Sequence, residues 1–237
     1  MKLNANNPFY VVGFTVAISA AFTAVVMSVQ EATKARIERN EQLRRERALV
    51  RAFGLGDVAQ MTGAQVSEVV RTRIVGGLRV RDPETGKEFE VYRAYTTPEA
   101  ARDRSKQGLV GYAFEVAGSG FWAPIDGLMA VTPDLDKAIG IVFLSQSETP
   151  GLGGRITEDW FQDQFRGVAV APPPKGQSWV YIAREKPPKD DPRRSRTVDA
   201  ITGATQTSIA VAKFLNADIA EFHRAMAAGP AAQKERP

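Results

Sequence analysis

The first long pattern in the chain is an uncharged, apolar stretch from residue 8 to residue 29. At 1.5 Å per residue, a helix of this length measures about 33 Å, which is enough to cross a hydrocarbon core of roughly 30 Å. We therefore expect residues 1–30 to form a membrane anchor. The alternative is a cleaved signal peptide, but the stretch is longer than the usual signal core and a helix-like sequence follows it.

The anchor continues into a charged segment, residues 30–53, that contains neither proline nor glycine. Glutamate and arginine recur at i,i+3 and i,i+4 spacings, which predicts a helix. Its apolar positions form only a thin stripe, so we expect residues 31–55 to be a stalk whose C-terminal end docks onto a globular domain. Gly54 and Gly56 end this helix.

Strand-like patterns dominate the middle of the chain. Residues 108–117, 128–132 and 138–145 are rich in β-branched and aromatic side chains. A further turn, at residues 82–86, lies between two strand-like runs. Consecutive strands with short connections favour an antiparallel sheet.

Helical and strand signals alternate in the C-terminal part. Residues 160–165 predict a short aromatic helix, residues 178–183 a strand, and residues 207–227 an amphipathic helix. Residues 229–237 have the composition of a disordered tail. We therefore predict an α+β fold in which residues 56–228 form one domain after the anchor and stalk.

Composition excludes several kinds of site. The chain has no cysteine, which excludes disulfides, cysteine-ligated iron–sulfur clusters and thiol nucleophiles. Its single histidine, His223, is expected at the surface, which argues against a serine–histidine hydrolase or a multi-histidine zinc site. We therefore predict no metal site and no catalytic side chain, so any redox work needs an organic cofactor. The net charge of +4 lies in clusters without interleaved aromatics, which argues against nucleic-acid binding.

Residues 199–205, DAITGAT, place a hydroxyl group after a Gly-Ala pair, just before the predicted last helix. Gly203 permits a sharp turn and Ala204 adds little bulk, so a phosphate could approach Thr205 and the free N–H groups of the helix start. Asp199 could orient this hydroxyl or accept its proton. The alternative is a plain helix start with Thr205 or Thr207 as N-cap, and the chemistry alone favours it.

Two more segments combine glycines with residues that could contact a ligand. Residues 148–154, ETPGLGG, follow a predicted strand and could approach a planar ligand closely, although a loop that only turns the chain is the alternative. Residues 118–122, GSGFW, form a predicted tight turn with two aromatic side chains. For these aromatics we favour burial in the core over a wall that stacks on a ligand ring.

Together and in this order, these features resemble the FMN-binding subunits of the sodium-translocating NADH:quinone oxidoreductase and of the related Rnf complexes. The match comprises the membrane helix, the GxGFW turn, ETPGLGG after a strand, and DxxTGAT before the last helix. It is firmest over residues 108–216. Residues 118–122 look more like the C subunits of the sodium pump. Residues 57–105 are shorter than expected for a C subunit, so an Rnf-type G subunit and a stand-alone flavin carrier remain alternatives.

The resemblance implies a covalently bound cofactor. In this family a flavin transferase attaches FMN through its phosphate to the last threonine of a Ser/Thr-Gly-Ala-Thr motif, which by position is Thr205. Such a phosphoester needs neither cysteine nor histidine. The other cofactor-binding residues expected on this basis are Asp199, Thr202, Gly203, Ala204, Thr207, Glu148, Thr149, Gly151, Leu152 and Trp122.

The resemblance also implies a role and partners. The chain would relay electrons through FMN within a respiratory NADH:quinone reductase, without binding NADH or quinone itself, since no Gly-x-Gly-x-x-Gly strand–helix unit is present. Expected partners are other subunits of the membrane complex, a flavin transferase during maturation, and membrane lipid. The non-redox alternative is an anchored binding or assembly domain in which Thr205 only caps a helix.

Two rules disagree about the side of the membrane on which the domain lies. Only Lys2 precedes the span, whereas six basic residues follow it closely, which places the domain in the cytoplasm: Lys34, Arg36, Arg39, Arg44, Arg45 and Arg47. The flavin domains of the family lie on the periplasmic side, and large translocated domains can override the charge rule. We therefore expect a single-pass protein of the bacterial inner membrane with a periplasmic flavin domain.

Overall fold

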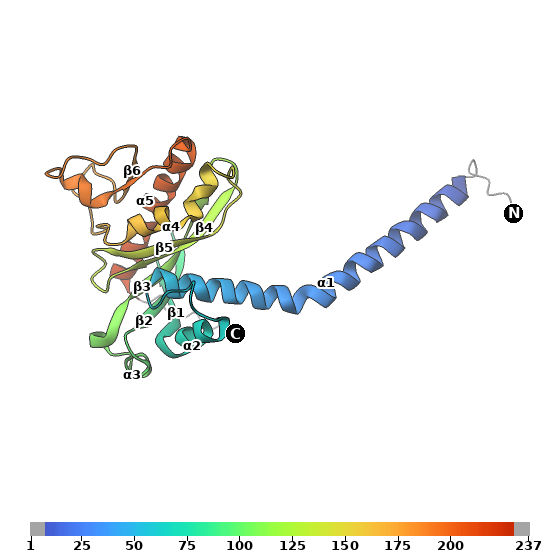
Figure 1. The fold of residues 1–237 in the computed structure, drawn as a ribbon, viewed down its shortest axis with the longest axis horizontal. Helices are drawn as coiled ribbons and strands as arrows, with labels where there is room; N and C mark the ends of the chain where they lie inside the picture. Colours follow the sequence, from blue (N-terminus) through green and yellow to red (C-terminus); the bar gives the residue numbers. More distant parts are fainter. Residues whose placement is uncertain (1–7, 230–237) are drawn as a thin grey trace. The chain divides into compact units, whose positions relative to one another are not determined.

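The computed structural model describes residues 8–229 (Figure 1). The chain forms two compact units, residues 1–43 and residues 44–237. The boundary between them lies within helix α1 (Pro8–Ala52). The first seven residues of the expected anchor lie outside the described residues. So does the expected disordered tail, apart from Gly229.

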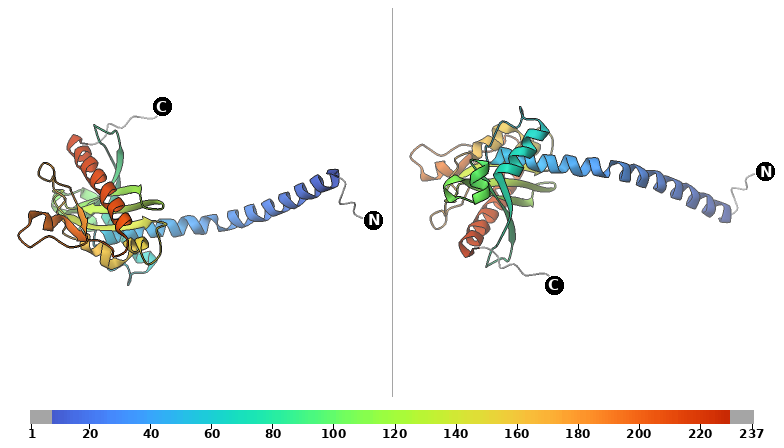
Figure 2. Two further views of the ribbon diagram at one scale, coloured as in Figure 1. Left: turned by 90° about the horizontal axis from the view of Figure 1, so that it is seen from above. Right: turned by 90° about the horizontal axis from the view of Figure 1, so that it is seen from below.

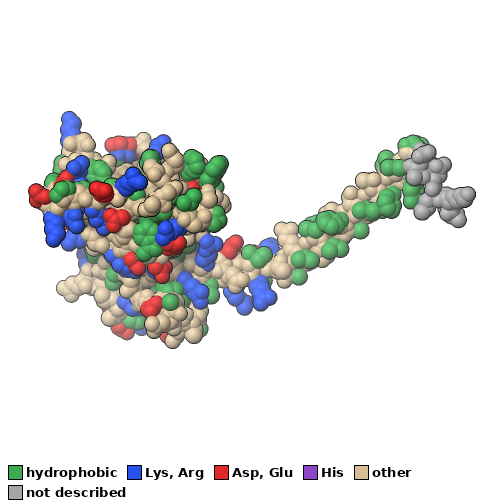
Figure 3. All heavy atoms as spheres, turned by 45° about the horizontal axis from the view of Figure 1, so that its top comes forward, with side chains coloured by type: hydrophobic (Ala, Val, Ile, Leu, Met, Phe, Trp, Pro, Cys, Tyr) green, Lys and Arg blue, Asp and Glu red, His purple; other side chains and the backbone are tan. Residues whose placement is uncertain are grey.

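The first unit is the N-terminal part of α1, whose side chains are exposed and mostly apolar up to residue 29 (Figure 3). This part is long and apolar enough to cross a membrane. A continuous apolar surface of this kind is unfavourable in water and matches a hydrocarbon environment. The expected long apolar helix is therefore confirmed. Its large exposed apolar residues are Phe9, Val11, Val12, Phe14, Val16, Ile18, Phe22, Val25, Val26, Met27 and Val29.

The second unit is built on a five-stranded antiparallel sheet in which strands that are consecutive in the chain are neighbours. The expected α+β fold with an antiparallel sheet is confirmed. The turn expected at residues 82–86 joins the first two strands. The strands are β1 (Ile74–Arg81), β2 (Glu88–Tyr95), β3 (Leu109–Ser119), β4 (Pro124–Val131) and β5 (Ala138–Ser145).

Strand β4 begins four residues before the predicted start at Leu128. The added residues include a proline and a glycine, which disfavour a strand when judged locally. They pair with β3 nonetheless, up to Ser119 opposite Pro124. Pro124 is tolerated because it is the first residue of the strand. Cross-strand pairing therefore overrides local propensity here.

The sheet is covered on both faces. The end of α1 packs on one face through Ala48, Leu49, Ala52 and Phe53, which confirms that the stalk docks onto the domain. Helix α5 (Thr205–Ala228) covers the other face (Figure 2). There the rings of Phe114 and Phe222 stack with centroids 3.8 Å apart. The sheet and α5 thus share one apolar core.

Short elements connect and flank this core. They are α2 (Gly63–Arg73), α3 (Pro98–Asp103), α4 (Asp159–Gln162), the 3₁₀ turns η1 (Lys106–Gly108), η2 (Gly153–Thr157), η3 (Asp163–Phe165) and η4 (Pro192–Arg196), and strands β6 (Tyr181–Ala183) and β7 (Thr197–Asp199). The aromatic helix expected at residues 160–165 is confirmed as α4 followed by η3.

The strand expected at residues 178–183 is wrong in extent. Only its last three residues form a strand, and this strand pairs in parallel with β7 rather than joining the main sheet. The reason lies on α5, where the Asn216 side-chain oxygen accepts hydrogen bonds from the backbone N–H groups of Trp179 and Val180. These groups are therefore bound to a side chain and not to a neighbouring strand.

A buried ion pair joins the β1–β2 turn to the last turns of α5. Asp82 is fully buried, and its carboxylate accepts two hydrogen bonds from Arg224, at 2.9 and 2.7 Å. It also accepts a hydrogen bond from the hydroxyl of Thr85. Hydrogen bonding to Arg224 holds the pKa of Asp82 well below its ordinary value, against the opposing effect of burial.

This lowered pKa predicts a dependence of stability on pH. A carboxylate whose pKa is depressed by folding stabilises the protein above its unfolded pKa of about 4, and this contribution is lost as pH falls toward the folded pKa. We expect Asp82→Asn to lower the melting temperature at neutral pH and to flatten its decline below pH ~4. Circular dichroism of the detergent-solubilised chain measures both effects.

The matched control is Glu84→Gln, which removes an exposed carboxylate that also approaches Arg224. This variant should melt within a degree or two of the wild type, since exposed ion pairs contribute little. An unchanged pH profile in Asp82→Asn would contradict the assignment.

Candidate functional site

The three segments singled out from the sequence meet at one buried carboxylate, that of Glu148. One of its oxygens accepts a hydrogen bond from the backbone N–H of Trp122 at 2.8 Å. The other accepts a hydrogen bond from the hydroxyl of Thr207 at 2.7 Å. The side chain therefore joins the β3–β4 turn, the loop after β5 and the first turn of α5. Both oxygens of this buried side chain are thus hydrogen-bonded within the protein.

Two glycines leave the room that this arrangement needs. A Cβ atom at Gly120 would lie 2.5 Å from the Glu148 carboxylate, and one at Gly153 would lie 2.4 Å from the Thr207 hydroxyl oxygen. Real Cβ contacts are not that short. At these two positions the glycines of the GSGFW and ETPGLGG segments are therefore required by packing around Glu148.

The DAITGAT segment leads into α5 through a left-handed residue. Gly203 has a φ of 82°, a conformation that glycine adopts without strain. The N-cap of α5 is Ala204, which makes no side-chain capping hydrogen bond among the described residues. The alternative in which Thr205 or Thr207 is the N-cap therefore does not hold, since Ala204 occupies that position. Thr205 is instead the first helical residue and is exposed, while Thr207 is buried.

A cavity of about 330 Å³ opens beside this helix start. Its walls come from the β3–β4 turn, the loop after β5 and the start of α5. Phe121 is 52 % exposed and Trp122 is 68 % exposed, so our preference for burying these aromatics in the core was wrong. The lining consists of Phe121, Trp122, Thr149, Leu152, Gly153, Gly203, Ala204, Thr205, Gln206 and Thr207.

Most of the site residues expected from the sequence come together here. Trp122, Thr149, Leu152, Gly203, Ala204, Thr205 and Thr207 all line the cavity, and Glu148 holds its walls from beneath. Phe121, Gly153 and Gln206 also line it and were not expected as contacts. Phe121 and Gly153 lie within motifs that the sequence marked, whereas Gln206 carries no signal of its own.

Besides Glu148, three of the expected residues do not line the cavity, namely Gly151, Asp199 and Thr202. The carboxylate of Asp199 lies 3.4 Å from the ammonium group of Lys186. Its backbone N–H donates a hydrogen bond to the side chain of Gln164. Asp199 is therefore held by contacts away from the hydroxyl of Thr205, which differs from the orienting role considered above.

The chemistry of the cavity suits an anionic group attached to a ring. Free N–H groups and the positive end of the dipole of α5 favour a phosphate next to Thr205. The exposed faces of Phe121 and Trp122 and the side chain of Leu152 offer apolar contact to an aromatic ligand. The residues present thus fit a flavin phosphate.

A second hollow, of about 610 Å³, continues along α5 and shares Phe121 and Gln206 with this cavity. Its other lining residues include Ile209, which is exposed, and Lys213. A ligand longer than the first cavity therefore has adjoining space into which it can extend.

The single histidine is not part of this site. His223 is partly buried against the ring of Trp179, with ring centroids 4.5 Å apart. Burial lowers its pKa. The expectation that His223 lies freely at the surface is therefore wrong. Its role is to pack against Trp179 in the core of the domain.

Comparisons with known proteins agree with this geometry. Residues 120–220 match the family model described as "FMN-binding domain". The match begins at the β3–β4 turn and ends within α5, so it contains every residue that lines the 330 Å³ cavity.

Curated relatives include members of two kinds of membrane complex. The chain is 33 % identical over 121 residues to the C subunit of the Na(+)-translocating NADH-quinone reductase of Chlamydia pneumoniae, covering 46 % of this chain and 37 % of the relative. It is 33 % identical over 104 residues to the G subunit of the proton-translocating ferredoxin:NAD(+) oxidoreductase complex of Clostridium ljungdahlii, covering 44 % of this chain and 49 % of the relative. The chain thus matches less than half of the length of either relative.

Solved structures share the fold. NqrC of Shewanella oneidensis superimposes with a TM-score of 0.62 at 19 % identity, over 81 % of this chain and 99 % of that chain. The C subunit of the Na(+)-translocating NADH-quinone reductase from Parabacteroides distasonis gives a TM-score of 0.64 at 21 % identity, over 81 % and 95 %. The chain therefore shares the fold of these two solved structures, and its residues 120–220 match the FMN-binding domain model.

Proposed function

We propose that this chain is a membrane-anchored flavoprotein that carries electrons through FMN attached to Thr205, as one subunit of an ion-translocating NADH:quinone reductase. One observation carries the proposal. The segment that matches the FMN-binding domain encloses a cavity with an exposed threonine hydroxyl at the uncapped start of a long helix. When bound, FMN supplies one- and two-electron redox chemistry that no side chain of this chain provides.

The choice of Thr205 rests on the contrast with its neighbours. Thr207 also lines the cavity, but its hydroxyl is buried and donates to Glu148. Thr205 is exposed, and its position at the helix start places an esterified phosphate near free N–H groups. Esterification joins the Thr205 oxygen to the phosphorus of an activated FMN donor, and the hydroxyl proton and the leaving group of the donor depart. A flavin transferase would supply this donor and recognise the motif that includes Asp199 and Thr202.

The remaining residues of the site would orient and shield the cofactor. Trp122, Phe121 and Leu152 provide apolar surface, and Glu148 keeps the walls together without contacting the ligand. An ester bond prevents the cofactor from dissociating, which suits a carrier that exchanges electrons repeatedly with neighbouring redox centres. We expect these centres to lie on other members of the complex.

Anchoring follows from the apolar part of α1. We place this helix across the bacterial inner membrane and the flavin domain on its periplasmic side. The length and exposed apolar surface of the helix support its role as a membrane anchor. The family resemblance supports the periplasmic location of the flavin domain.

Two other functions stay open. The relative from Clostridium ljungdahlii favours an Rnf-type G subunit as the alternative within the same class, with a stand-alone flavin carrier beside it. A non-redox binding or assembly domain would use Thr205 only as a helix residue.

The attachment is tested on a denaturing gel. When the chain is co-expressed with a flavin transferase, we expect a band that fluoresces under ultraviolet light and that Thr205→Ala abolishes, because within residues 205–208, the first turn of α5, only Thr205 has an exposed hydroxyl. Thr149→Ala removes an exposed hydroxyl that lines the same cavity and should keep the fluorescence. Thr207→Ala should keep it as well. A fluorescent Thr205→Ala band, or a dark wild-type band, would refute the ester at Thr205.

The packing around Glu148 gives a second prediction. Gly153→Ala places a methyl group against Thr207 and Glu148, and we expect it to lower the free energy of unfolding by about 1–3 kcal/mol and to reduce FMN loading. Gly154→Ala is the matched control, since its added Cβ would have no neighbour closer than 3.4 Å. Urea unfolding followed by tryptophan fluorescence measures the stability of both variants, and gel fluorescence measures their loading. Equal effects of the two substitutions would show that the crowding at Gly153 does not matter.

The absence of cysteine from the sequence allows the side of the membrane to be tested by labelling. With a membrane-impermeant maleimide, we expect Lys175→Cys, in an exposed loop of the domain, to be labelled in intact cells. Asn4→Cys, which precedes the apolar span, should be labelled only after lysis. The reverse pattern would place the domain in the cytoplasm, as the charge rule predicts.

A further inference from the structure

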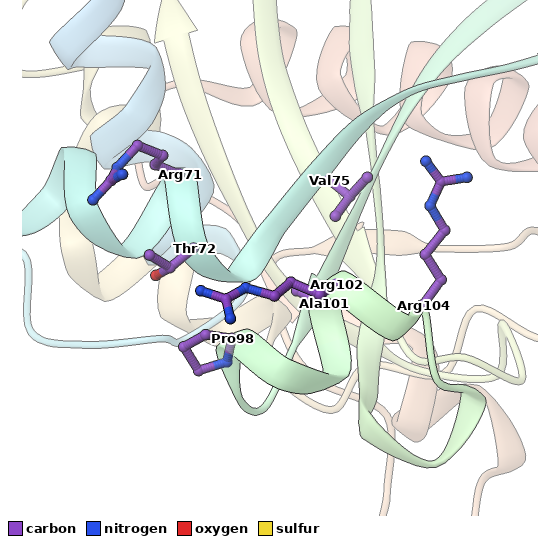
Figure 4. Close-up of a pocket in the computed structure, with 7 residues that line it drawn as sticks. All are labelled: Arg71, Thr72, Val75, Pro98, Ala101, Arg102 and Arg104. Atoms are coloured by element: carbon purple, nitrogen blue, oxygen red, sulfur yellow. The ribbon is translucent and has the colours of Figure 1, made fainter.

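A hollow of about 440 Å³ lies between α2, β1 and α3, and it shares no residue with the flavin cavity. Its floor is apolar and consists of Val75, Pro98 and Ala101. Three arginines stand around this floor, with Arg71 and Arg102 toward Thr72 and Pro98 and Arg104 beyond Val75 (Figure 4). None of the described residues that line the hollow is acidic.

The charge of these arginines is not neutralised locally. Within residues 8–229, the guanidinium groups of Arg71, Arg102 and Arg104 take part in no ion pair and no hydrogen bond. Arg102 interacts electrostatically with the nearby Glu99, which is an exposed residue of the same helix. Three cations therefore surround one hollow with up to fifteen N–H donors unused.

A further arginine, Arg93, pairs with one residue of the hollow but does not itself line it. Arg93 on β2 lies directly opposite Val75 in the pairing with β1, so both side chains project from the same face of the sheet. The Nε atom of Arg93 is buried and has no hydrogen-bond partner among the described residues. Buried donors are nearly always satisfied in folded proteins. An unpaired buried donor therefore lies on the strand that pairs with Val75, which adds to the unneutralised positive charge of this region.

Ordinary structural roles account for only part of the cluster. Arg71 and Arg102 lie in the last turns of α2 and α3, where a positive charge is favourable to the helix dipole. The helix dipole does not explain Arg93, because this residue is on a strand. Arg104 is the C-cap of α3, where the dipole also favours a cation, but its φ of 50° is a conformation in which glycine or asparagine is the usual residue.

We propose that this hollow binds a phosphate ester, with the phosphate oxygens between the arginines and the organic part over Val75, Pro98 and Ala101. A phosphate offers several acceptor oxygens and up to two negative charges, which matches several guanidinium forks better than one carboxylate does. The apolar floor accommodates an organic part, such as glycerol, that a bare phosphate ion lacks. A phospholipid headgroup and a soluble phosphorylated metabolite share this chemistry.

Isothermal titration calorimetry of the full chain in a neutral detergent tests the proposal and separates the two sources. Glycerol 3-phosphate is the soluble probe, with glycerol as its uncharged counterpart. Short-chain phosphatidylglycerol is the lipid probe, with short-chain phosphatidylcholine as its zwitterionic counterpart. The test variant is Arg71→Gln/Arg102→Gln. The matched control is Arg79→Gln/Arg184→Gln, which removes two arginines that lie outside the hollow.

We expect at least one anionic probe to bind, and the test variant to weaken its affinity roughly tenfold or more, as lost charge-assisted hydrogen bonds would. The control should stay within about twofold, since it changes net charge without changing the hollow. Arg71→Lys/Arg102→Lys should fall between them, because lysine keeps the charge but not the planar fork. All variants should retain gel fluorescence from FMN, which separates this site from the flavin site.

Several results would overturn the proposal. One is that neither glycerol 3-phosphate nor phosphatidylglycerol binds. Another is an equal loss of affinity in the test and control variants, which would indicate diffuse charge attraction. Equal affinity of the test variant and the wild type would also refute it. Binding of phosphatidylglycerol alone would assign the site to lipid, and binding of glycerol 3-phosphate as well would assign it to a soluble ester.

Discussion

The candidate site depends on the carboxylate of Glu148, which joins three segments that are far apart in the sequence. A buried carboxylate is costly unless hydrogen bonds replace its water, and here the Trp122 N–H and the Thr207 hydroxyl do so. These two bonds hold the β3–β4 turn and the start of α5 against the loop after β5. The space around the carboxylate admits only glycine at positions 120 and 153. The shape of the cavity therefore depends on the side chain of Glu148 and on the two glycines, Gly120 and Gly153, that leave room for it.

Helix α5 is attached to the sheet at several points and positions Thr205 at the cavity. Its N-terminal turn bears Thr205, and its C-terminal third is held by the stacked rings of Phe222 and Phe114 and by the pair of Arg224 with Asp82. Asp218 adds a contact midway, since it accepts a hydrogen bond from the backbone N–H of Ala117 and pairs with Lys87. A rigid helix fixed at several points presents its first residue in one orientation, which a site for a tethered cofactor requires.

Local patterns predicted much of the fold, and the misses have physical causes. The apolar span, the strand over residues 138–145 and the turn at residues 82–86 depend on short-range patterning and were confirmed. Helix α2 was not assigned, although Thr62 and Gln65 form a capping box that the sequence displays. The strand at residues 178–183 was overestimated because Asn216 on α5 binds its backbone. Phe121 and Trp122 were expected in the core, but they lie in the hairpin turn between β3 and β4, which leaves them exposed.

By itself, the sequence determined the class of fold, the apolar helix and the three motifs that meet at the cavity, because each depends on residues close together in the chain. It did not determine which hydroxyl near the start of α5 is free. Thr205 and Thr207 are the same residue type two positions apart, and local chemistry favoured either one as the N-cap of the helix. The tertiary structure decided between them, because the hydroxyl of Thr207 is bound by a carboxylate 59 residues away while Thr205 remains exposed. That contact is long-range, so no local pattern encodes it.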